Sequence, residues 1–269
     1  MRFFAGNRFN FILKLQKHNS LLKKERQAFI LHRLNLHNKV LSMDLCNDIG
    51  VSEDTIRRDL QELADAGRLI KVHGGALSMA FSEIQFTPVN VYSQSQKTII
   101  AQKALQLVNS GMYVLTSGGT TILELVRNLP MNLRATFMTG SIPVVNACIP
   151  YPNIDVVVIG DKLSKDSKIT VGADAIEQIS RVNADLCFLG TNAIDVAHGI
   201  TDNDRDVVQV KKAMVYSATK VACMTISEKL ETFQPIQVCE LKKIDYLITE
   251  LDPGDKKLRP FVDAGVTVL

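Results

Sequence analysis

The sequence has few cysteines and histidines, and neither residue type is spaced for metal binding. Five of each occur among 269 residues, with no CxxC pair and no HxxxH spacing. Three of the cysteines lie in apolar runs, which favours buried thiols in a reducing cytoplasm over ligands or disulfides. We therefore expect no metal site. The cysteines are Cys46, Cys148, Cys187, Cys223 and Cys239.

Long hydrophobic runs and repeats are also missing. No apolar run approaches the ~20 residues that a membrane-spanning helix needs, and no internal repeat or low-complexity tract is present. Apolar residues make up 46% of the chain and charged residues 22%, which is ordinary for a globular protein. We expect a cytoplasmic protein without membrane segments.

Basic residues exceed acidic residues only because of the N-terminal stretch. Four of the 31 basic residues lie in residues 1–21, which hold no acidic residue, and the rest of the chain is close to neutral. A basic arm that grips DNA phosphates is one interpretation of residues 1–21. A misassigned upstream start codon or a dispensable extension is the other, and it is the one we favour.

The most informative stretch runs from Ser42 to Gly67 and predicts two short helices joined by a tight turn. We expect Ser42 to cap the first helix, and Gly50 to form the turn because glycine reaches positive φ without steric cost. Ser52 is expected to cap the second helix, since serine side chains accept hydrogen bonds from free N–H groups there. Two helices in this arrangement are typical of a helix-turn-helix reader of the DNA major groove.

The second helix has one apolar stripe and one polar face. Ile56, Leu60 and Leu63 repeat with helical spacing and predict a buried side. The polar face carries Thr55, Arg57, Arg58 and Gln61. Periodicity alone leaves a second interpretation open, an ordinary helical pair whose arginines form surface ion pairs with Asp54 and Glu62.

A short strand and turn follow this helix and predict a wing. Residues 68–72 alternate in hydrophobicity, and His73-Gly74-Gly75 form a turn. Arg68, Lys71 and His73 would contact backbone phosphates from such a wing, which positions a protein on DNA without reading its sequence. The alternative is a solvated hairpin with no such role.

The family resemblance separates these alternatives. The segments KKERQAFILHRL (23–34), VSEDTIRRDLQEL (51–63) and GRLIKVHGGA (67–76) resemble the DNA-binding domain of DeoR-type bacterial transcription regulators. Seven residues at the cap and in the second helix match the family's recognition-helix signature position by position. These positions are Ser52, Thr55, Ile56, Arg57, Arg58, Asp59 and Leu60.

The remainder of the chain predicts a separate α/β domain. Seven short apolar segments between Tyr113 and Leu269 alternate with helical segments, which is typical of a parallel sheet flanked by helices. We expect an extension at 1–21, a winged helix-turn-helix domain at 22–77, a linker at 78–96 and an α/β effector domain at 97–269.

Three loops are candidate ligand sites, because open α/β sheets bind ligands beyond the carboxyl ends of their strands. The first, Ser117-Gly118-Gly119-Thr120-Thr121, opens a helix and offers free N–H groups and hydroxyls to an anion. It matches neither the dinucleotide nor the Walker glycine motif, so no such cofactor is indicated. The second loop is Gly140-Ser141, and the third contains Lys229. Lys211 is another possible cation, although a single lysine is usually only a solvated surface charge.

The second half of the chain also resembles the DeoR-type sensor domain, which is related in fold to ribose-5-phosphate isomerase. The resemblance implies a phosphorylated sugar or related metabolite as effector, bound near Gly119-Thr120-Thr121, Ser141, Asp206, Lys211 and Lys229. Three departures from the family pattern remove polar groups. Ser117 stands where the family has Asp, Gly140 where it has Asn, and Ile226 where it has Asp.

These observations predict a DNA-binding regulator, by family habit a repressor, whose operator affinity is controlled by a phosphorylated sugar. A homo-dimer or tetramer is expected, because pairing two reading heads across a two-fold axis increases specificity. Two alternatives stay open. One is a sugar-phosphate isomerase-like enzyme with an appended DNA-binding module, although the first loop lacks the expected carboxylate. The other is a constitutive DNA binder with a degenerate sensor.

Overall fold

The computed structural model describes residues 21–37, 39–79 and 92–269. The chain divides into two compact units, Met1–Glu83 and Ile84–Leu269. The division falls within the segment 78–96 that the sequence predicts as a linker. Most of that segment, residues 80–91, and residues 1–20 of the predicted extension lie outside the described residues.

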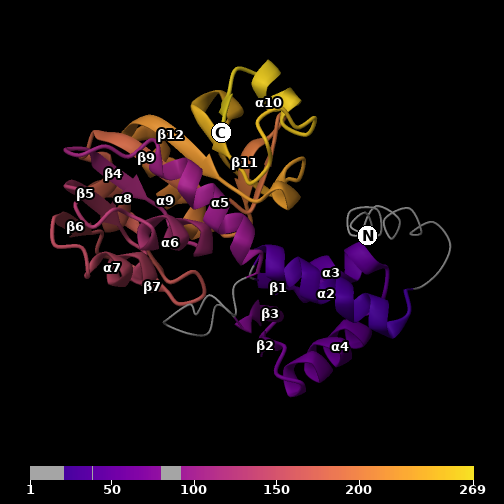
Figure 1. The fold of residues 1–269 in the computed structure, drawn as a ribbon. Coiled ribbons are helices and arrows are strands. Elements are labelled where there is room, and N and C mark those ends of the chain that lie inside the picture. The colour runs from indigo at the N-terminus through magenta and orange to yellow at the C-terminus, as the bar shows by residue number, and fades with distance from the viewer. Residues whose placement is uncertain (1–20, 38, 80–91) are drawn as a thin grey trace. The chain divides into compact units, whose positions relative to one another are not determined.

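The N-terminal unit is a winged helix-turn-helix (Figure 1). Its small antiparallel sheet has the strand order β1-β3-β2, in which β2 and β3 form the predicted wing. Strand β1 was not predicted, because three residues are too few to show alternation. The elements are α2 (Lys23–His37), β1 (Lys39–Leu41), α3 (Ser42–Ile49), α4 (Glu53–Asp65), β2 (Leu69–Val72) and β3 (Gly75–Ser78).

The turn between α3 and α4 forms as expected, but the start of α3 does not. Gly50 has φ 73° and ends α3, and Ser52 caps α4 by accepting a hydrogen bond from the Thr55 N–H at 3.4 Å. The expectation that Ser42 caps α3 is wrong. Ser42 is the first helical residue, Leu41 occupies the cap position, and the Ser42 N–H donates to the Gly74 carbonyl at 2.8 Å. The pairing of β1 with β3 therefore fixes where α3 begins.

A buried ion pair connects α2 to α4. The Asp59 side chain on α4 is 2% exposed, and Arg26 on α2 holds it through two hydrogen bonds, Nε to Oδ2 and Nη2 to Oδ1. Gln27 donates to the same carboxylate at 3.5 Å. The pair sits beside an apolar core that includes Ile30 and Ile56, both fully buried.

The C-terminal unit is built on a seven-stranded, entirely parallel sheet with the order β15-β14-β12-β9-β4-β5-β6. All seven predicted strands are present. They are β4 (Tyr113–Thr116), β5 (Ala135–Thr139), β6 (Ile154–Val158), β9 (Ala184–Gly190), β12 (Ala218–Met224), β14 (Tyr246–Ile248) and β15 (Thr267–Val268).

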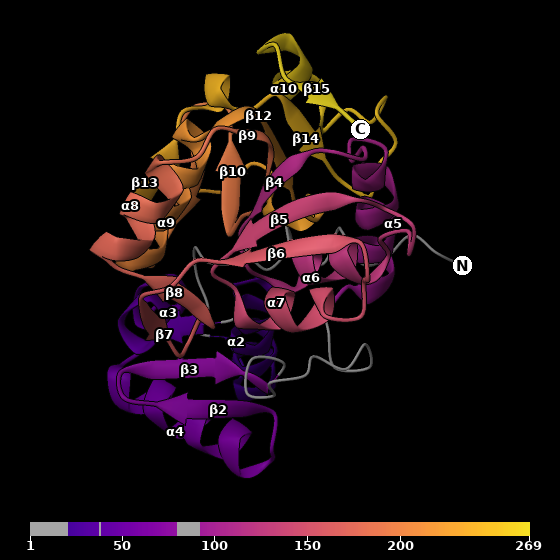
Figure 2. The same ribbon diagram turned by 90° about the vertical axis from the view of Figure 1, so that its left-hand side faces the viewer.

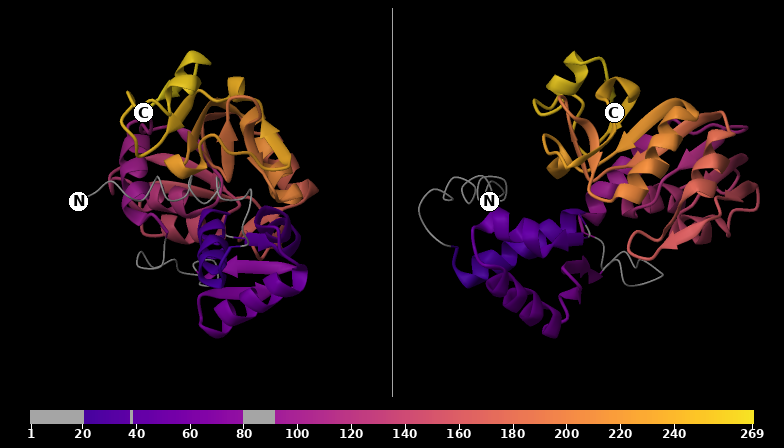
Figure 3. Two further views of the ribbon diagram at one scale, coloured as in Figure 1. Left: turned by 90° about the vertical axis from the view of Figure 1, so that its right-hand side faces the viewer. Right: turned by 180° about the vertical axis from the view of Figure 1, so that it is seen from behind.

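Helices cover both faces of this sheet (Figure 2, Figure 3). Helices α5, α6 and α7 form one layer, and α8 and α9 pack together on the other face, as right-handed crossovers require. The helix predicted from residue 97 begins three residues earlier, at Gln94. The helices are α5 (Gln94–Leu105), α6 (Thr120–Arg127), α7 (Ile142–Cys148), α8 (Ala173–Ser180), α9 (Arg205–Tyr216) and α10 (Arg259–Asp263).

Five further strands were not predicted, because they are short: two pairs form hairpins after β6 and β9, and the fifth pairs with a strand more than 30 residues earlier. Strands β7 and β8 form an antiparallel pair, and β10, β11 and β13 form a small antiparallel sheet. Their bounds are β7 (Lys162–Ser164), β8 (Ile169–Val171), β10 (Ala193–Asp195), β11 (Gly199–Asp202) and β13 (Ile236–Cys239).

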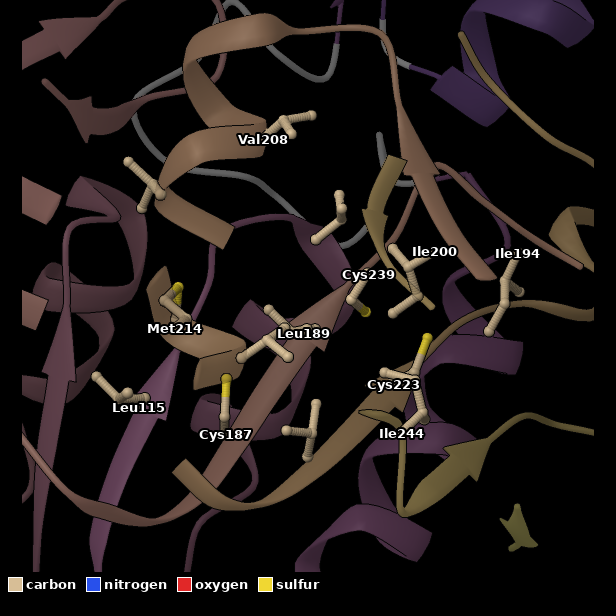
Figure 4. Close-up of a cluster of buried hydrophobic side chains, with 14 of the residues drawn as sticks. Leu115, Cys187, Leu189, Ile194, Ile200, Val208, Met214, Cys223, Cys239 and Ile244 are labelled. Carbon is tan, nitrogen blue, oxygen red and sulfur yellow. The ribbon is translucent and has the colours of Figure 1, made fainter. Parts of the chain in front are cut away.

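The main core of this unit lies between the sheet and the layer that contains α8 and α9. Figure 4 shows Leu115, Leu189 and Met214 pointing into it from β4, β9 and α9. The thiols of Cys187, Cys223 and Cys239 lie in the same core, and burial raises the pKa of the Cys239 thiol to about 11. All five cysteines are free, as expected from their apolar surroundings.

Replacing Arg26 by methionine tests whether the buried ion pair holds α4 in place. The change leaves the Asp59 carboxylate buried without its cation, and removing one partner of such a pair costs about 3 kcal/mol or more. We expect Arg26→Met to lower the free energy of unfolding of the N-terminal unit by that amount in urea denaturation followed by circular dichroism.

Lys23→Met is the matched control, because Lys23 also pairs α2 with α4, but through Glu62 at 57% and 48% side-chain exposure. An exposed pair contributes roughly 0–1 kcal/mol. Equal losses in the two variants would contradict a special role for Arg26 and Asp59.

Candidate functional site

The outer face of α4 presents two arginines that share one carboxylate. Arg57 and Arg58 are 70% and 77% exposed, and each donates to Asp54, at 2.7 and 2.6 Å. These hydrogen bonds and the nearby positive charges lower the pKa of Asp54. The exposed carboxylate leaves both guanidinium groups accessible while it restricts where they point. Ser52 is exposed and Thr55 half-buried at the start of the same helix.

The wing adds positive charge beside this face. Lys71 on β2 donates to Gln61 on α4 at 2.8 Å, and Gln61 donates to Asp65 at 2.7 Å. Arg68 and His73 are exposed on either side of Lys71 along the wing. Every residue that the sequence nominated for DNA contact therefore lies on α4, at its cap, or on the wing.

The candidate ligand loops meet at one edge of the large sheet. Strands β12, β9, β4 and β5 are consecutive neighbours and parallel, so the loops that follow them leave from the same edge. The chain crosses over in opposite directions after β4 and after β9, which makes their boundary the switch point where open α/β sheets bind ligands. A Cβ added to Gly118 would lie 3.2 Å from Ser141 Oγ, so the first two loops are in contact.

Ser117 joins two strands at this switch point. Its side chain is fully buried, its Oγ accepts a hydrogen bond from the Gly190 N–H at 2.9 Å, and its own N–H donates to the Phe188 carbonyl at 3.0 Å. The serine that stands in place of the family's aspartate thus ties the end of β4 to the end of β9.

The rest of the first loop forms the N-terminus of α6. Gly119 has φ 107° and ψ 161° at the cap position, and the helix begins at Thr120. The Leu123 N–H donates to the Gly119 carbonyl. The regular hydrogen bonds of the helix therefore start at Leu123, and the N–H groups of the residues before it lie outside that pattern. Thr120 and Thr121 are half-buried beside them. Such a terminus favours an anion through its dipole and its N–H donors.

Gly140 is in contact with a side chain from β8. A Cβ at this position would lie 2.2 Å from Thr170 Oγ1, which donates to the Ile159 carbonyl at 2.8 Å. The space that the family's asparagine would need is therefore taken by threonine. Ser141 is 1% exposed and forms an isolated antiparallel bridge with Ile169 of β8.

Lys229 lies on the 3-10 turn η3 (Ser227–Lys229) after β12 and donates to the Thr191 carbonyl at 2.8 Å. Burial, followed by the positive charges of Lys97 and Lys211, lowers the pKa of Lys229 to about 7. Burial also lowers the pKa of Lys97 to about 8. These three lysines, which we call the lysine cluster, place like charges close enough to destabilise one another.

Carboxylates partly balance the lysine cluster: Glu124 and Glu228 act on Lys97, and Asp202 acts on Lys229. Lys211 and Asp202 are buried and form an ion pair at 2.8 Å. The charge of Lys211 and hydrogen bonds from Lys211, Asn203 and Asn192 outweigh burial and lower the pKa of Asp202. Asp206, the acid nominated from the sequence, is exposed on the first turn of α9 and its N–H donates to Asp204. The structure therefore brings Lys211, but not Asp206, towards Lys229.

Sequence reasoning missed Lys97 and Asp202. Lys97 falls in register with Ile100, Ala101 and Ala104, the buried face of α5, so helical spacing alone could have marked it as an unusual buried lysine. Asp202 ends β11, a short strand that the hydrophobic pattern did not reveal.

The described residues give no sign of a metal centre or of a membrane segment. No group of three or more His, Cys, Asp or Glu side chains among residues 21–37, 39–79 and 92–269 lies close enough to hold a metal ion. Within the same residues, no helix has the length and apolar character needed to span a bilayer.

Two family models match the chain. Residues 26–80 match the DeoR-like helix-turn-helix domain, and residues 93–251 match the DeoR C-terminal sensor domain. Their boundaries leave residues 81–92 between the two matched regions.

Curated relatives match over nearly their whole length. The HTH-type transcriptional regulator GlpR of Haloferax volcanii is 32% identical over 93% of this chain and 98% of its own. The regulator GolR of Listeria innocua is 29% identical over 91% of this chain and 97% of its own. The HTH-type transcriptional repressor GlcR of Bacillus subtilis is 29% identical over 87% of this chain and 91% of its own.

Solved structures with a similar backbone include ribose 5-phosphate isomerase A from Methanocaldococcus jannaschii. That similarity covers 52% of this chain and 55% of the isomerase, with 18% identity and a TM-score of 0.39. The family models and the relatives, rather than this likeness, decide the assignment. They place the chain among transcriptional regulators and not among enzymes. The protein belongs to the DeoR family of helix-turn-helix transcriptional regulators.

Proposed function

We propose that this regulator is a cytoplasmic repressor of carbohydrate metabolism genes whose operator affinity falls when its sensor domain binds a phosphorylated sugar or a related metabolite. The lysine cluster carries the effector half of the proposal. Burial and the charges of Lys97 and Lys211 destabilise the ammonium form of Lys229, and a phosphate dianion bound beside it would stabilise that form. The N-terminus of α6 supplies N–H donors at the same edge of the sheet.

The sugar would lie beside the phosphate, along the loops after β5 and β9. Ser141 and Asn192 border this region, and Asn192 already donates to Asp202 at 2.7 Å. Thr170 takes up the space that a side chain at position 140 would need, so this chain would select a different sugar from relatives that carry the asparagine implied by the resemblance. The name of the relative GlcR, a repressor, supports the proposed sign of regulation.

The DNA half of the proposal places α4 in the major groove. Arg57 and Arg58 would contact base edges or phosphates, while Arg68, Lys71 and His73 of the wing would contact the backbone. One reading head contacts only a few base pairs. We propose that the protein acts as a homo-dimer or tetramer, so that two heads bind half-sites about one helical turn, or a multiple of it, apart.

Arg57→Ala and Arg58→Ala test the DNA-reading face. Each should raise the operator Kd by roughly tenfold or more, the cost of about 1–3 kcal/mol for a lost bidentate base contact. A lost phosphate contact would instead lower the salt slope by about 1. Fluorescence anisotropy on the promoter next to the protein's own gene, at several salt concentrations, measures both quantities.

Arg181→Ala is the matched control, because Arg181 forms the same kind of i,i+4 ion pair, with Glu177 on α8. It should leave the operator Kd unchanged. Wild-type affinity in both single variants and in the double variant would show that α4 is not the reading helix.

The depressed pKa of Lys229 predicts that effector binding depends on pH. A bound phosphate favours the ammonium form and raises the pKa of Lys229 from about 7. Above pH 7 binding must therefore take up a proton, and affinity should fall by up to roughly tenfold per pH unit. Isothermal titration calorimetry with hexose 6-phosphates and pentose 5-phosphates, in buffers of different ionisation enthalpy, measures the affinity and the proton uptake.

Lys229→Arg is the control for this titration, because arginine keeps its charge throughout the range. If the variant binds, its affinity should lose the steep fall above pH 7. Wild-type affinity that stays constant between pH 7 and 9 would exclude Lys229 from the effector site.

A further inference from the structure

The turn that carries Lys229 is bound to the first described residue of the sensor unit. The Tyr92 hydroxyl donates to the carboxylate of Glu228, at 2.8 Å to Oε2 and 3.0 Å to Oε1. Glu228 is the residue immediately before Lys229 on η3. Burial and the neighbouring carboxylate raise the pKa of Tyr92, so the hydroxyl keeps its proton and remains a donor.

The main chain of Tyr92 is held by the lysine cluster as well. Lys97, one turn into α5 and 7% exposed, donates to the Tyr92 carbonyl at 2.5 Å. The charge of Lys97 acts on Lys229, and the charge of Glu228 acts on Lys97. Tyr92 is therefore connected to the candidate phosphate site through both its side chain and its carbonyl.

A second connection runs in parallel. Glu250, after β14, accepts hydrogen bonds from the Ser227 N–H at 2.9 Å and from the Ser227 hydroxyl at 2.6 Å. Gln96 on α5 donates to the same carboxylate at 3.4 Å. The turn η3 is thus attached to the N-terminal part of α5 at two points, so a shift of η3 would be transmitted to residues 92–97.

Tyr92 lies in the short segment between the two matched domains. It lies between the residues that match the DNA-binding family model, 26–80, and those that match the sensor model, 93–251. Any signal that passes along the chain between the two units passes through Tyr92.

We propose that the Tyr92–Glu228 hydrogen bond couples the effector site to the DNA-binding unit. This inference rests on the proposed function. An anion bound at Lys229 repels the adjacent Glu228 carboxylate and draws Lys97 away from the Tyr92 carbonyl. Occupancy of the site would therefore weaken both attachments of Tyr92, and such a difference between two states is what allosteric coupling requires.

Tyr92→Phe tests the coupling by removing only the hydroxyl. The quantity to measure is the ratio of operator Kd with and without saturating effector, using hexose 6-phosphates and pentose 5-phosphates, with inorganic phosphate as the anion control. A wild-type ratio in the usual range of roughly 5- to 150-fold should fall to about twofold or less. Binding of the same sugar phosphate to the variant, measured by calorimetry, should remain detectable.

Tyr113→Phe is the matched control, because Tyr113 is also half-buried in this unit but its hydroxyl contacts Met138 Sδ at 3.6 Å rather than the site. It should keep the wild-type ratio. Glu228→Gln keeps an acceptor for Tyr92 but removes the charge that a bound anion would repel, so it should lower the ratio. The double variant Tyr92→Phe/Glu228→Gln should lower it no further than the larger single effect.

The outcomes separate this inference from the proposed function. A wild-type protein that responds to a sugar phosphate, together with a Tyr92→Phe variant that responds equally, would overturn the inference and leave the proposed function standing. A wild-type protein whose operator affinity no sugar phosphate changes would overturn both. Loss of the response in Tyr92→Phe and in Glu228→Gln, with Tyr113→Phe unchanged, would support the coupling.

Discussion

The pairing of β4 with β9 is the constraint on which the sensor unit depends. These two strands are neighbours in the sheet but are separated in the sequence by β5 and β6, so the chain must return across the sheet to form β9. Ser117 secures the pairing at its carboxyl end by accepting the Gly190 N–H. The loops that leave β4 and β9 diverge from this point, and the candidate effector site lies where they diverge.

Electrostatics would give the proposed effector site its selectivity for anions. Burying a cation is costly unless it is paired; Asp202 pairs with Lys211, whereas Lys229 donates to the Thr191 carbonyl. Burial destabilises the charged form of Lys229 in the folded protein, and this lowers its pKa. A phosphate group would remove much of the cost on binding, so the same arrangement that destabilises the free site favours occupancy.

The DNA-binding unit differs from the sensor unit, because side chains that are to contact DNA must stay exposed to solvent. Arg57 and Arg58 both pair with Asp54, whose side chain is itself 48% exposed, and both guanidinium groups stay at the surface. Their direction is set from the opposite face of α4, where Arg26 grips Asp59 and the stripe of Ile56 and Leu60 packs into the core. Asp59 is buried against Arg26, so we expect it to act by positioning α4 rather than by contact with DNA.

Much of this organisation could be predicted from the sequence, and the exceptions have physical reasons. The stripe on α4, the Ser52 cap and the seven parallel strands follow from periodicity and local turn chemistry, which are properties of neighbouring residues. The role of Asp202 depends on β11, a strand too short to show a pattern. The contact between Gly140 and Thr170 joins two loops about 30 residues apart, and the start of α3 depends on pairing between β1 and β3. Such long-range contacts leave no local signal.

In the proposed function, one chain joins a sequence-specific DNA-binding domain to a sensor of phosphorylated sugars. The most direct test is the binding of the wild-type protein to the promoter beside its own gene, at fixed salt, with and without a panel of sugar phosphates and their unphosphorylated sugars. We expect the protein to bind this promoter more tightly than an unrelated duplex. At least one sugar phosphate, but not its parent sugar, should weaken that binding. A folded protein that does not discriminate between the two duplexes, or whose specific binding no sugar phosphate alters, would contradict the proposed function.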